Sequence, residues 1–206
     1  MKLILSSHIP KTAGRSFLVS LIRIFGDENV LRDYGNLQPE KDGLRKIEEN
    51  HRCIHGHFSI NKYKDHIQDC EWVTWIRNPV ERVISSYCYW EREKAGHDGY
   101  PHIDIEDFIA MPDAGNLQSR MLRGLNIEDF LFIGISEYYD VMHDKFCEIL
   151  DVPMVPKVNI NHNPLKHSSD KYIVPKHIKR QIKKRNRDDL WLYDMVYHMN
   201  KRKGII

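Results

Sequence analysis

The chain has 206 residues, of which 41% are hydrophobic and 29% are charged, and its formal net charge is +2. This composition is typical of an ordinary globular protein and excludes fibrous, disordered and membrane-embedded classes. The length is enough for one domain with a substantial core, so we predict a single domain over residues 1–206. The small net charge gives no reason to expect a nucleic acid partner.

The first half of the chain alternates between expected strands and helices. An apolar run that ends at a proline predicts a buried strand, and apolar residues at helical spacing that end at a glycine predict a helix. The expected elements are a strand at 2–9, a helix at 16–26, a helix at 39–50, a short strand within 52–60, a central strand at 71–77 and a helix that starts at Asn78-Pro79.

The second half continues the alternation. We expect helices at 104–111 and 116–123, a strand at 130–135, an amphipathic helix at 137–150, an ordered loop at 151–170 and two closing helices. Strands that alternate with helices predict an α/β fold with a mostly parallel central sheet flanked by helices. Ligands of such folds bind beyond the carboxyl ends of the strands, which is where the polar motifs of this sequence fall.

The stretch HIPKTAGRSF (8–17) follows the first expected strand and leads into a helix. The N–H groups and dipole of a helix N-terminus attract anions. Gly14 allows close approach of the backbone, Lys11 adds charge, and Thr12 and Ser16 add hydroxyl groups. The stretch therefore predicts a phosphate-binding loop, although no G-x-x-x-x-G-K-[ST] and no clear Walker B partner are present. The alternative is a helix capped by Ser16 with an exposed lysine.

The stretch WIRNPVERVISSY (75–87) repeats this arrangement after another strand. Arg77 lies at the strand end, and its planar guanidinium suits a phosphate. Ser85 follows about two helical turns later. Two anion sites in one sheet predict a ligand with phosphates at two places, such as a nucleotide with both 5′ and 3′ phosphates. The alternative is an arginine paired with Glu81 and a serine that faces the core.

The stretch IHGHFS (54–59) places His55 and His57 two residues apart. In an extended strand both side chains would point to one face, toward the same cleft as the loop. A neutral imidazole there could act as a general base toward a hydroxyl. Two other interpretations remain open, a pair of zinc ligands that lacks an evident third ligand and a pair of surface histidines on a polar turn.

The four cysteines form no C-x-x-C motif and predict free thiols in a reducing compartment. The opening residues are too short for a signal peptide, and no apolar run approaches the length that spans a bilayer. We therefore expect a cytoplasmic protein. The stretch 176–187 is strongly basic, which predicts either a binding surface for an anionic glycan or a solvated helix face.

Three of these motifs, in this order, resemble the carbohydrate sulfotransferases, and specifically the heparan-sulfate 2-O-sulfotransferase-like group. The resemblance is carried by PKTAGRSF (10–17), HGHFS (55–59) and IRNPVERVISSYCYW (76–90), and extends more loosely through 116–122 and 133–142. It implies a P-loop-like three-layer sandwich and transfer of the sulfuryl group of 3′-phosphoadenosine 5′-phosphosulfate (PAPS) to a sugar hydroxyl. The product would be adenosine 3′,5′-bisphosphate (PAP), and no metal would be required.

The resemblance also implies roles for individual residues. His57 is identified as the general base with His55 beside it, and Lys11 as the group that steadies the leaving phosphate oxygen. Arg77 and Ser85 would hold the 3′-phosphate, and Asn159 lies in a stretch similar to the family's late loop over the donor. The 5′-phosphosulfate loop would consist of Lys11, Thr12, Ala13, Gly14, Arg15, Ser16 and Phe17.

Two residues depart from the family pattern. Arg15 stands where a small hydroxyl residue is common, and Asn78 replaces the usual aspartate after Arg77. The stem and anchor of Golgi enzymes are missing, so the alternative to a cytoplasmic protein is the excised soluble catalytic domain of such an enzyme. The alternative functions are a P-loop kinase-like phosphotransferase and a non-catalytic module that binds polyanions. The sequence names neither the acceptor nor the oligomeric state.

Overall fold

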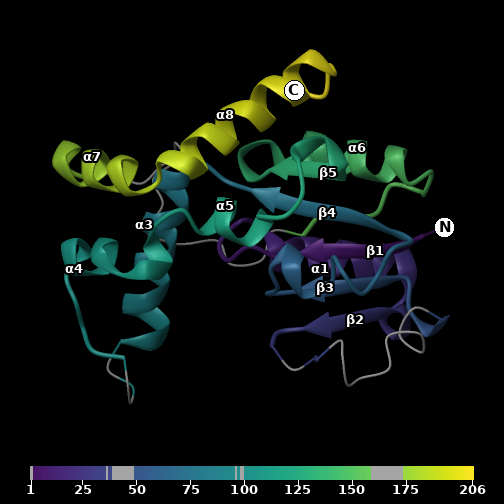
Figure 1. Ribbon diagram of the computed structural model, residues 1–206, viewed down its shortest axis with the longest axis horizontal. Coiled ribbons are helices and arrows are strands. Elements are labelled where there is room, and N and C mark those ends of the chain that lie inside the picture. The colour runs from purple at the N-terminus through teal and green to yellow at the C-terminus, as the bar shows by residue number, and fades with distance from the viewer. Residues whose placement is uncertain (1, 36, 39–48, 96, 98–99, 159–173) are drawn as a thin grey trace.

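A parallel sheet runs through the centre of the protein, as the computed structural model shows (Figure 1). The structure describes residues 2–35, 37–38, 49–95, 97, 100–158 and 174–206. Within them the sheet has five strands in the order β2-β3-β1-β4-β5, and every neighbouring pair is parallel. The strands are β1 (Leu3–Ser7), β2 (Val30–Asp33), β3 (Cys53–Gly56), β4 (Cys70–Ile76) and β5 (Phe130–Ile135).

Helices connect and flank these strands. They are α1 (Gly14–Phe25), α3 (Pro79–Tyr89), α4 (Ile105–Ala110), α5 (Leu117–Leu122), α6 (Tyr139–Ile149), α7 (Lys176–Arg185) and α8 (Arg187–Arg202), and a short π-helical segment (Trp90–Lys94) extends α3. The α/β prediction with a mostly parallel sheet is confirmed. Some of the predictions lie outside the described residues. They are most of the expected helix at 39–50, most of the expected loop at 151–170, and the predicted contact of Asn159 with the donor.

Two differences from the expected elements concern the N-terminal third. β2 was not predicted, because it has only four residues and two of them, Arg32 and Asp33, are charged. Asp33 is nevertheless fully buried, where it accepts hydrogen bonds from Lys62 Nζ at 2.5 Å and from the Tyr63 hydroxyl at 2.9 Å. Helix α1 begins at Gly14, two residues before the expected start.

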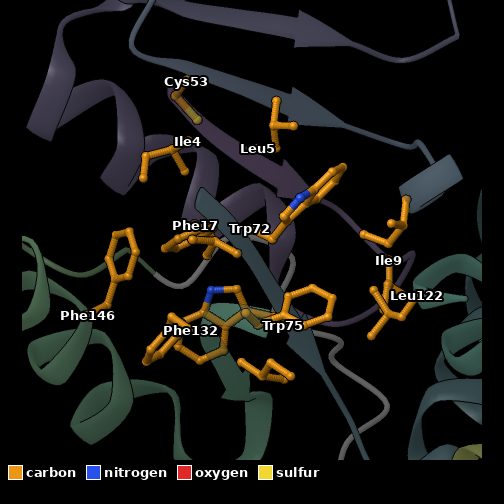
Figure 2. Packing of buried hydrophobic residues seen from close by; sticks show 14 of the residues in the cluster. Ile4, Leu5, Ile9, Phe17, Cys53, Trp72, Trp75, Leu122, Phe132 and Phe146 are labelled. Atoms are coloured by element: carbon orange, nitrogen blue, oxygen red, sulfur yellow. The ribbon is translucent and has the colours of Figure 1, made fainter. Parts of the chain in front are cut away.

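The main core fills the space between the sheet and its helices (Figure 2). Phe17 of α1 lies 5.0 Å from Phe146 of α6 between ring centroids, and 5.5 Å from Trp75 of β4. Gly134 of β5 makes room for Trp75, because a Cβ there would lie 2.3 Å from the indole. Full burial of each large side chain contributes about 1.5–3 kcal/mol, so this cluster fixes the position of α1 on the sheet.

A second apolar cluster joins α3, α4 and α7, and it includes Val83, Phe108, Ile178 and Ile182. These three helices lie together beyond the carboxyl ends of the strands, on the left of Figure 1. The loops that leave β1, β3 and β4 emerge on that side. β1 lies between β3 and β4, so the connections of the sheet run to opposite sides of β1. Ligands of open α/β sheets bind at such a switch point.

Candidate active site

The loop between β1 and α1 has a strained backbone. Lys11 and Ala13 have φ angles of 71° and 70°, in the left-handed region that residues with a Cβ rarely adopt. The buried hydroxyl of Thr12 donates to the Ile9 carbonyl at 2.8 Å and closes the loop. Strain of this kind is typical of functional loops whose surroundings impose the conformation. Thr12 therefore shapes the loop and commits its hydroxyl proton to it.

The N-terminus of α1 is open to an anion. Because the helix begins at Gly14, Ser16 lies within its first turn and is not the N-cap residue. The N-cap is Ala13, whose side chain has no hydrogen-bonding group, and the first turn holds no acidic residue. The first turn instead carries the exposed Arg15. Helix dipole and side-chain charge thus both favour an anion here.

Two cations meet at this loop. Arg77, which follows β4 directly, donates from Nη1 to the Lys11 carbonyl at 3.2 Å. The Lys11 ammonium lies 4.4 Å from the centroid of the Tyr89 ring. Burial and the positive charges of Arg77 and Arg92 lower the pKa of Lys11 to about 8. The loop therefore holds more positive charge than its surroundings compensate, as expected for a site that receives an anion.

The position of Arg77 is fixed through its backbone. The fully buried side-chain amide of Gln118 accepts from the Arg77 N–H at 2.8 Å and donates to the Arg77 carbonyl at 2.9 Å. The Arg77 guanidinium also pairs with Glu81 at 3.9 Å, and Ser85 is buried on α3. The pair with Glu81 and the burial of Ser85 are what the structural alternative predicts, and Arg77 contacts Lys11 as well. Their role in binding a 3′-phosphate stays a prediction.

Asn78, one of the two departures from the family pattern, caps helix α3. Its Oδ1 accepts from the N–H groups of Val80 at 3.0 Å and Glu81 at 3.5 Å. Its own N–H donates to Glu137 Oε1 at 2.9 Å. Burial raises the pKa of Glu137, and the charge of Glu81 raises it further. A neutral amide at residue 78 keeps the cap and avoids a third carboxylate beside these two.

The two histidines of the H-x-H motif occupy different environments. β3 ends at Gly56, so only His55 lies in the strand. His55 is fully buried, and the parallel register places it beside Ser6, whose hydroxyl is 2.8 Å from His55 Nδ1. Burial and the neighbouring His57 lower the pKa of His55 to about 3. The two side chains therefore do not both open to one cleft, and His55 has no access to an acceptor.

His57 lies past the strand end and is exposed. Its Nδ1 is 2.7 Å from the carbonyl oxygen of His8. A carbonyl can only accept, so Nδ1 carries the proton and Nε2 keeps its lone pair. Desolvation by the surrounding groups lowers the pKa of His57, although the hydrogen bond to His8 opposes this. The ring is therefore neutral at pH 7 with one nitrogen available as a base.

His8 and Tyr34 belong to this group and were missed from the sequence. The His8 ring lies between the other two imidazoles, 5.0 Å from His55 and 4.3 Å from His57 between centroids. Tyr34 follows β2, and its ring meets that of His57 edge-on at 4.9 Å. Burial, the two histidines and Arg15 lower the pKa of His8 to about 2. The sequence did show a histidine at the end of the first expected strand, but its closeness to the H-x-H pair depends on the order of the strands.

Four further features bear on the remaining predictions. The Phe17 side chain is in the core, and its N–H donates to the Ala13 carbonyl at 3.0 Å. Cys53, Cys70, Cys88 and Cys147 are free thiols, as predicted. Within the described ranges, no group of three or more His, Cys, Asp or Glu side chains is placed to hold a metal ion. None of the helices described there is long and apolar enough to span a membrane.

Comparison with known proteins gives one kind of match. No family model and no curated protein matches the sequence. Among solved structures, a sulfotransferase from Alicyclobacillus acidocaldarius superposes with a TM-score of 0.57 at 13% identity, over 96% of both chains. The chain has the sulfotransferase fold. Mouse sulfotransferase SULT7A1 in complex with PAP superposes with a TM-score of 0.50 at 17% identity. That match covers 75% of this chain, which spans 61% of the mouse protein.

The structure places the residues of the three sequence motifs around one loop. In this sulfotransferase fold, the loop from Lys11 to Ser16 and the strand-end Arg77 lie side by side, joined by the hydrogen bond from Arg77 to the Lys11 carbonyl. His57 lies on the other side of the same loop, joined to it through His8. The structure thus brings together the cations and the candidate base that the sequence placed on three separate segments.

Proposed function

We propose that this chain is a single-domain sulfotransferase that moves the sulfuryl group of PAPS to a hydroxyl of a carbohydrate acceptor. One observation carries the proposal. A neutral imidazole, His57, has Nδ1–H committed to a carbonyl and Nε2 available, and it lies beside a cation-rich loop at a helix N-terminus. A base beside an anion site suits transfer of an anionic group to a hydroxyl. The sulfotransferase fold supports the same conclusion.

The residues of the loop fit a phosphosulfate donor. PAPS supplies an activated sulfuryl group with a phosphate as leaving group. Lys11 and Arg15 provide charge for the 5′ side, and the N–H groups at the start of α1 point outward as donors. Arg77 and Ser85 are the candidates for the 3′-phosphate. Burial and the neighbouring charges of Arg77 and Arg92 lower the pKa of Lys11, and the negative charge of a phosphosulfate would raise it again.

The role of His57 follows from its hydrogen bond. His57 Nε2 accepts the proton of the acceptor hydroxyl, and the resulting imidazolium keeps its Nδ1–H bonded to the His8 carbonyl. This carbonyl holds the ring in the tautomer that a base needs. The lowered pKa of His57 keeps the base unprotonated at neutral pH. Lys11 stabilises negative charge on the departing phosphate oxygen.

The finer parts of the proposal are the chemical nature of the acceptor and the cellular compartment of the protein. The resemblance in sequence points to a carbohydrate. Helix α7 supports an anionic one, because Lys183 and Lys184 are exposed on it and no acidic residue lies in its first turn. The four free thiols support a reducing, cytoplasmic compartment.

The test is transfer of labelled sulfate from PAPS to a panel of sugars, glycans and small hydroxyl compounds. Thermal shift with PAP against ATP and Mg²⁺ accompanies the assay, because a kinase-like phosphotransferase would respond to the second pair. We expect stabilisation by PAP and label transfer to at least one carbohydrate. Stabilisation by ATP and Mg²⁺ alone, or no response to PAP at millimolar concentration, would contradict the proposal.

The basic face of α7 favours one alternative, a non-catalytic module that binds polyanions. Such a module would bind heparin without transferring sulfate, and its binding would depend on α7 alone. Reversing two exposed charges, Lys183→Glu and Lys184→Glu, separates the possibilities. In the enzyme these changes weaken binding of an anionic acceptor and leave stabilisation by PAP intact, whereas the module would show no PAP stabilisation at all.

A further inference from the structure

One buried ring lies between the donor loop and the candidate base. The His8 side chain is 7% exposed, and it follows β1 at the point where the chain turns into the loop. The backbone N–H of His8 donates to the Gly56 carbonyl at 2.8 Å, which continues the pairing of β1 with β3 past the strand ends. The backbone of His8 thus ties the loop to the segment that carries His57.

The ring of His8 contacts both sides. On one side it rests on the backbone of Gly14, because a Cβ on Gly14 would lie 1.9 Å from His8 Cδ2 and 2.1 Å from Nε2. On the other side its centroid lies 4.3 Å from that of His57, with the planes tilted by 34°. His55 stacks beneath it at 5.0 Å and 24°. One side chain therefore spans the space from the start of α1 to the base.

The His8 ring is uncharged at neutral pH. The groups that face it are His55 from β3, His57, Arg15 from α1, Lys11 and the Tyr34 hydroxyl, which is 3.4 Å from His8 Nδ1. Burial and these neighbours keep the imidazole neutral over the working range of pH. A neutral ring that is buried against Gly14 and His57 can act on the site through its shape and contacts.

We propose that the His8 ring is a positioning residue that sets the spacing between the donor loop at Gly14 and the base His57. The proposal rests on the sulfotransferase function argued above. In-line transfer needs the acceptor oxygen, activated by the base, at a fixed distance from the group held by the loop. A rigid ring wedged between the two elements fixes that distance, and Gly14 is required because any larger residue would displace the ring.

The first experiment compares His8→Ala with His8→Phe, using the full chain with PAPS and the best acceptor. Removing the ring lets His57 move relative to the loop, and a misplacement of about 1 Å costs on the order of 100-fold in rate. We therefore expect kcat of His8→Ala to fall about 10- to 100-fold while PAP binding changes less than about threefold. Phenylalanine restores most of the lost kcat because it refills the space. His198→Ala, on the exposed face of α8, is the matched control.

A double-mutant cycle tests the contact between His8 and Gly14. Gly14→Ala alone forces the ring out, and it should lower kcat about as much as His8→Ala. In the double variant the small residue at 8 leaves space for the new methyl group. The two effects should therefore not add, since the residues share one contact. Additive losses, or equal losses in His8→Phe and His8→Ala, would overturn the proposal, and so would wild-type kcat in His8→Ala.

A second measurement keeps the proposal testable if no sulfate is transferred. Nitrogen-15 NMR reports the tautomer and mobility of His57 without turnover. We expect the wild-type protein and His8→Phe to show one sharp signal for the His57 ring. In His8→Ala the backbone carbonyl of residue 8 is still present, but the ring loses its packing partner, so its signal should broaden and shift as the ring becomes mobile. Failure of PAP binding in the wild-type protein would refute the proposed function alone. A His57 signal that is unchanged in a folded His8→Ala would refute the role of the ring, whatever the enzyme does.

Discussion

Burial lowers pKa values on both sides of the loop between β1 and α1, with opposite consequences for the roles proposed for them. On one side are three imidazoles, His8, His55 and His57, whose pKa values are all lowered and which are therefore neutral. On the other side are Lys11 and Arg77, and burial lowers the pKa of Lys11 as well. A base works when neutral, whereas a lysine that holds a phosphate works when charged. The same desolvation thus favours the role proposed for His57 and opposes the one proposed for Lys11.

The two sides also differ in what holds them. Ring stacking and the His8 carbonyl position the histidines, so this side is complete without a ligand. The cations lie beside one another, and Arg77 forms an ion pair with Glu81 at 3.9 Å. An anion would reduce the mutual repulsion of Lys11 and Arg77. In the proposed function, the donor therefore completes the cation side.

The largest expected effect is on the histidine side. His57→Ala removes the base and should lower kcat about 10²- to 10⁴-fold, as loss of general base catalysis does. Stabilisation by PAP should persist, because the cations are untouched. Steady-state kinetics and thermal shift check both statements, with His198→Ala as the control. A loss of less than tenfold would show that another group takes the proton.

The next effect separates function from stability on the cation side. Lys11→Met should lower kcat about 10²- to 10³-fold, since a charge at the leaving group is lost. The ligand-free protein should become more stable, by about 1 kcal/mol after allowance for solvent screening, which is roughly 2–4 °C in Tm for a chain of this size.

The pH dependence of that stability gain is fixed by the pKa of Lys11. The folded value of about 8 lies below the unfolded value of 10.5, so the unfolded chain binds more protons between these values. Wild-type stability therefore rises with pH across this window. The advantage of Lys11→Met should be full below pH 8 and vanish toward pH 10.5. A constant difference in Tm at all pH values would contradict this account.

The two sides should also shape the pH profile of the reaction. The value of kcat/KM should rise with pH along an acid limb below pH 6.5, where His57 loses its proton. It should fall along an alkaline limb near pH 8, where Lys11 of the free enzyme loses its proton. Each limb changes the rate about tenfold per pH unit. With saturating donor the alkaline limb of kcat should move to higher pH, because bound phosphate raises the pKa of Lys11. Lys11→Arg should lack the alkaline limb at whatever activity it retains.

The smallest effect concerns the support of Arg77. Gln118→Leu removes the two hydrogen bonds to the Arg77 backbone and leaves those buried groups unsatisfied, at a cost of about 1–3 kcal/mol in unfolding free energy. PAP should bind several-fold more weakly, while the tautomer of His57 stays as in the wild type. Denaturant titration and calorimetry measure these quantities. A disturbed His57 would show that the two sides are not independent.

Much of the fold could be predicted from the sequence, because long periodic segments dominate it. β1, β4, β5 and the helices α1, α3 and α6 have uninterrupted apolar patterns of the expected period. β2 could not be found, because Asp33 is buried by partners 29 and 30 residues away, Lys62 and Tyr63. Arg82 is likewise hidden in the core, where its Nη2 donates to the Ala114 carbonyl at 3.0 Å. Local patterns carry no information on such long-range partners.

The candidate site shows the same limit. The motifs around Lys11, Arg77 and His57 were recognisable, because strand ends followed by glycine, arginine or histidine predict ligand contacts. The unequal burial of His55 and His57 depends on where β3 ends, and one residue decides it. The place of His8 depends on which strands are neighbours, and strand order is not written in any single segment. A spacing rule alone therefore could not assign the roles within the histidine group.

Helices α5 and α8 cap each other across more than 70 residues of sequence. The Asn116 Oδ1 accepts from the N–H groups of Asp188 and Asp189 at 3.1 and 3.3 Å. In return the Asp189 carboxylate accepts from the N–H groups of Gln118 and Ser119 at 3.1 and 2.8 Å. Gln118 is the residue that holds Arg77. A chain cut before α8 would lose the Asp189 contacts of Gln118, and we expect its Arg77 backbone to be held less firmly.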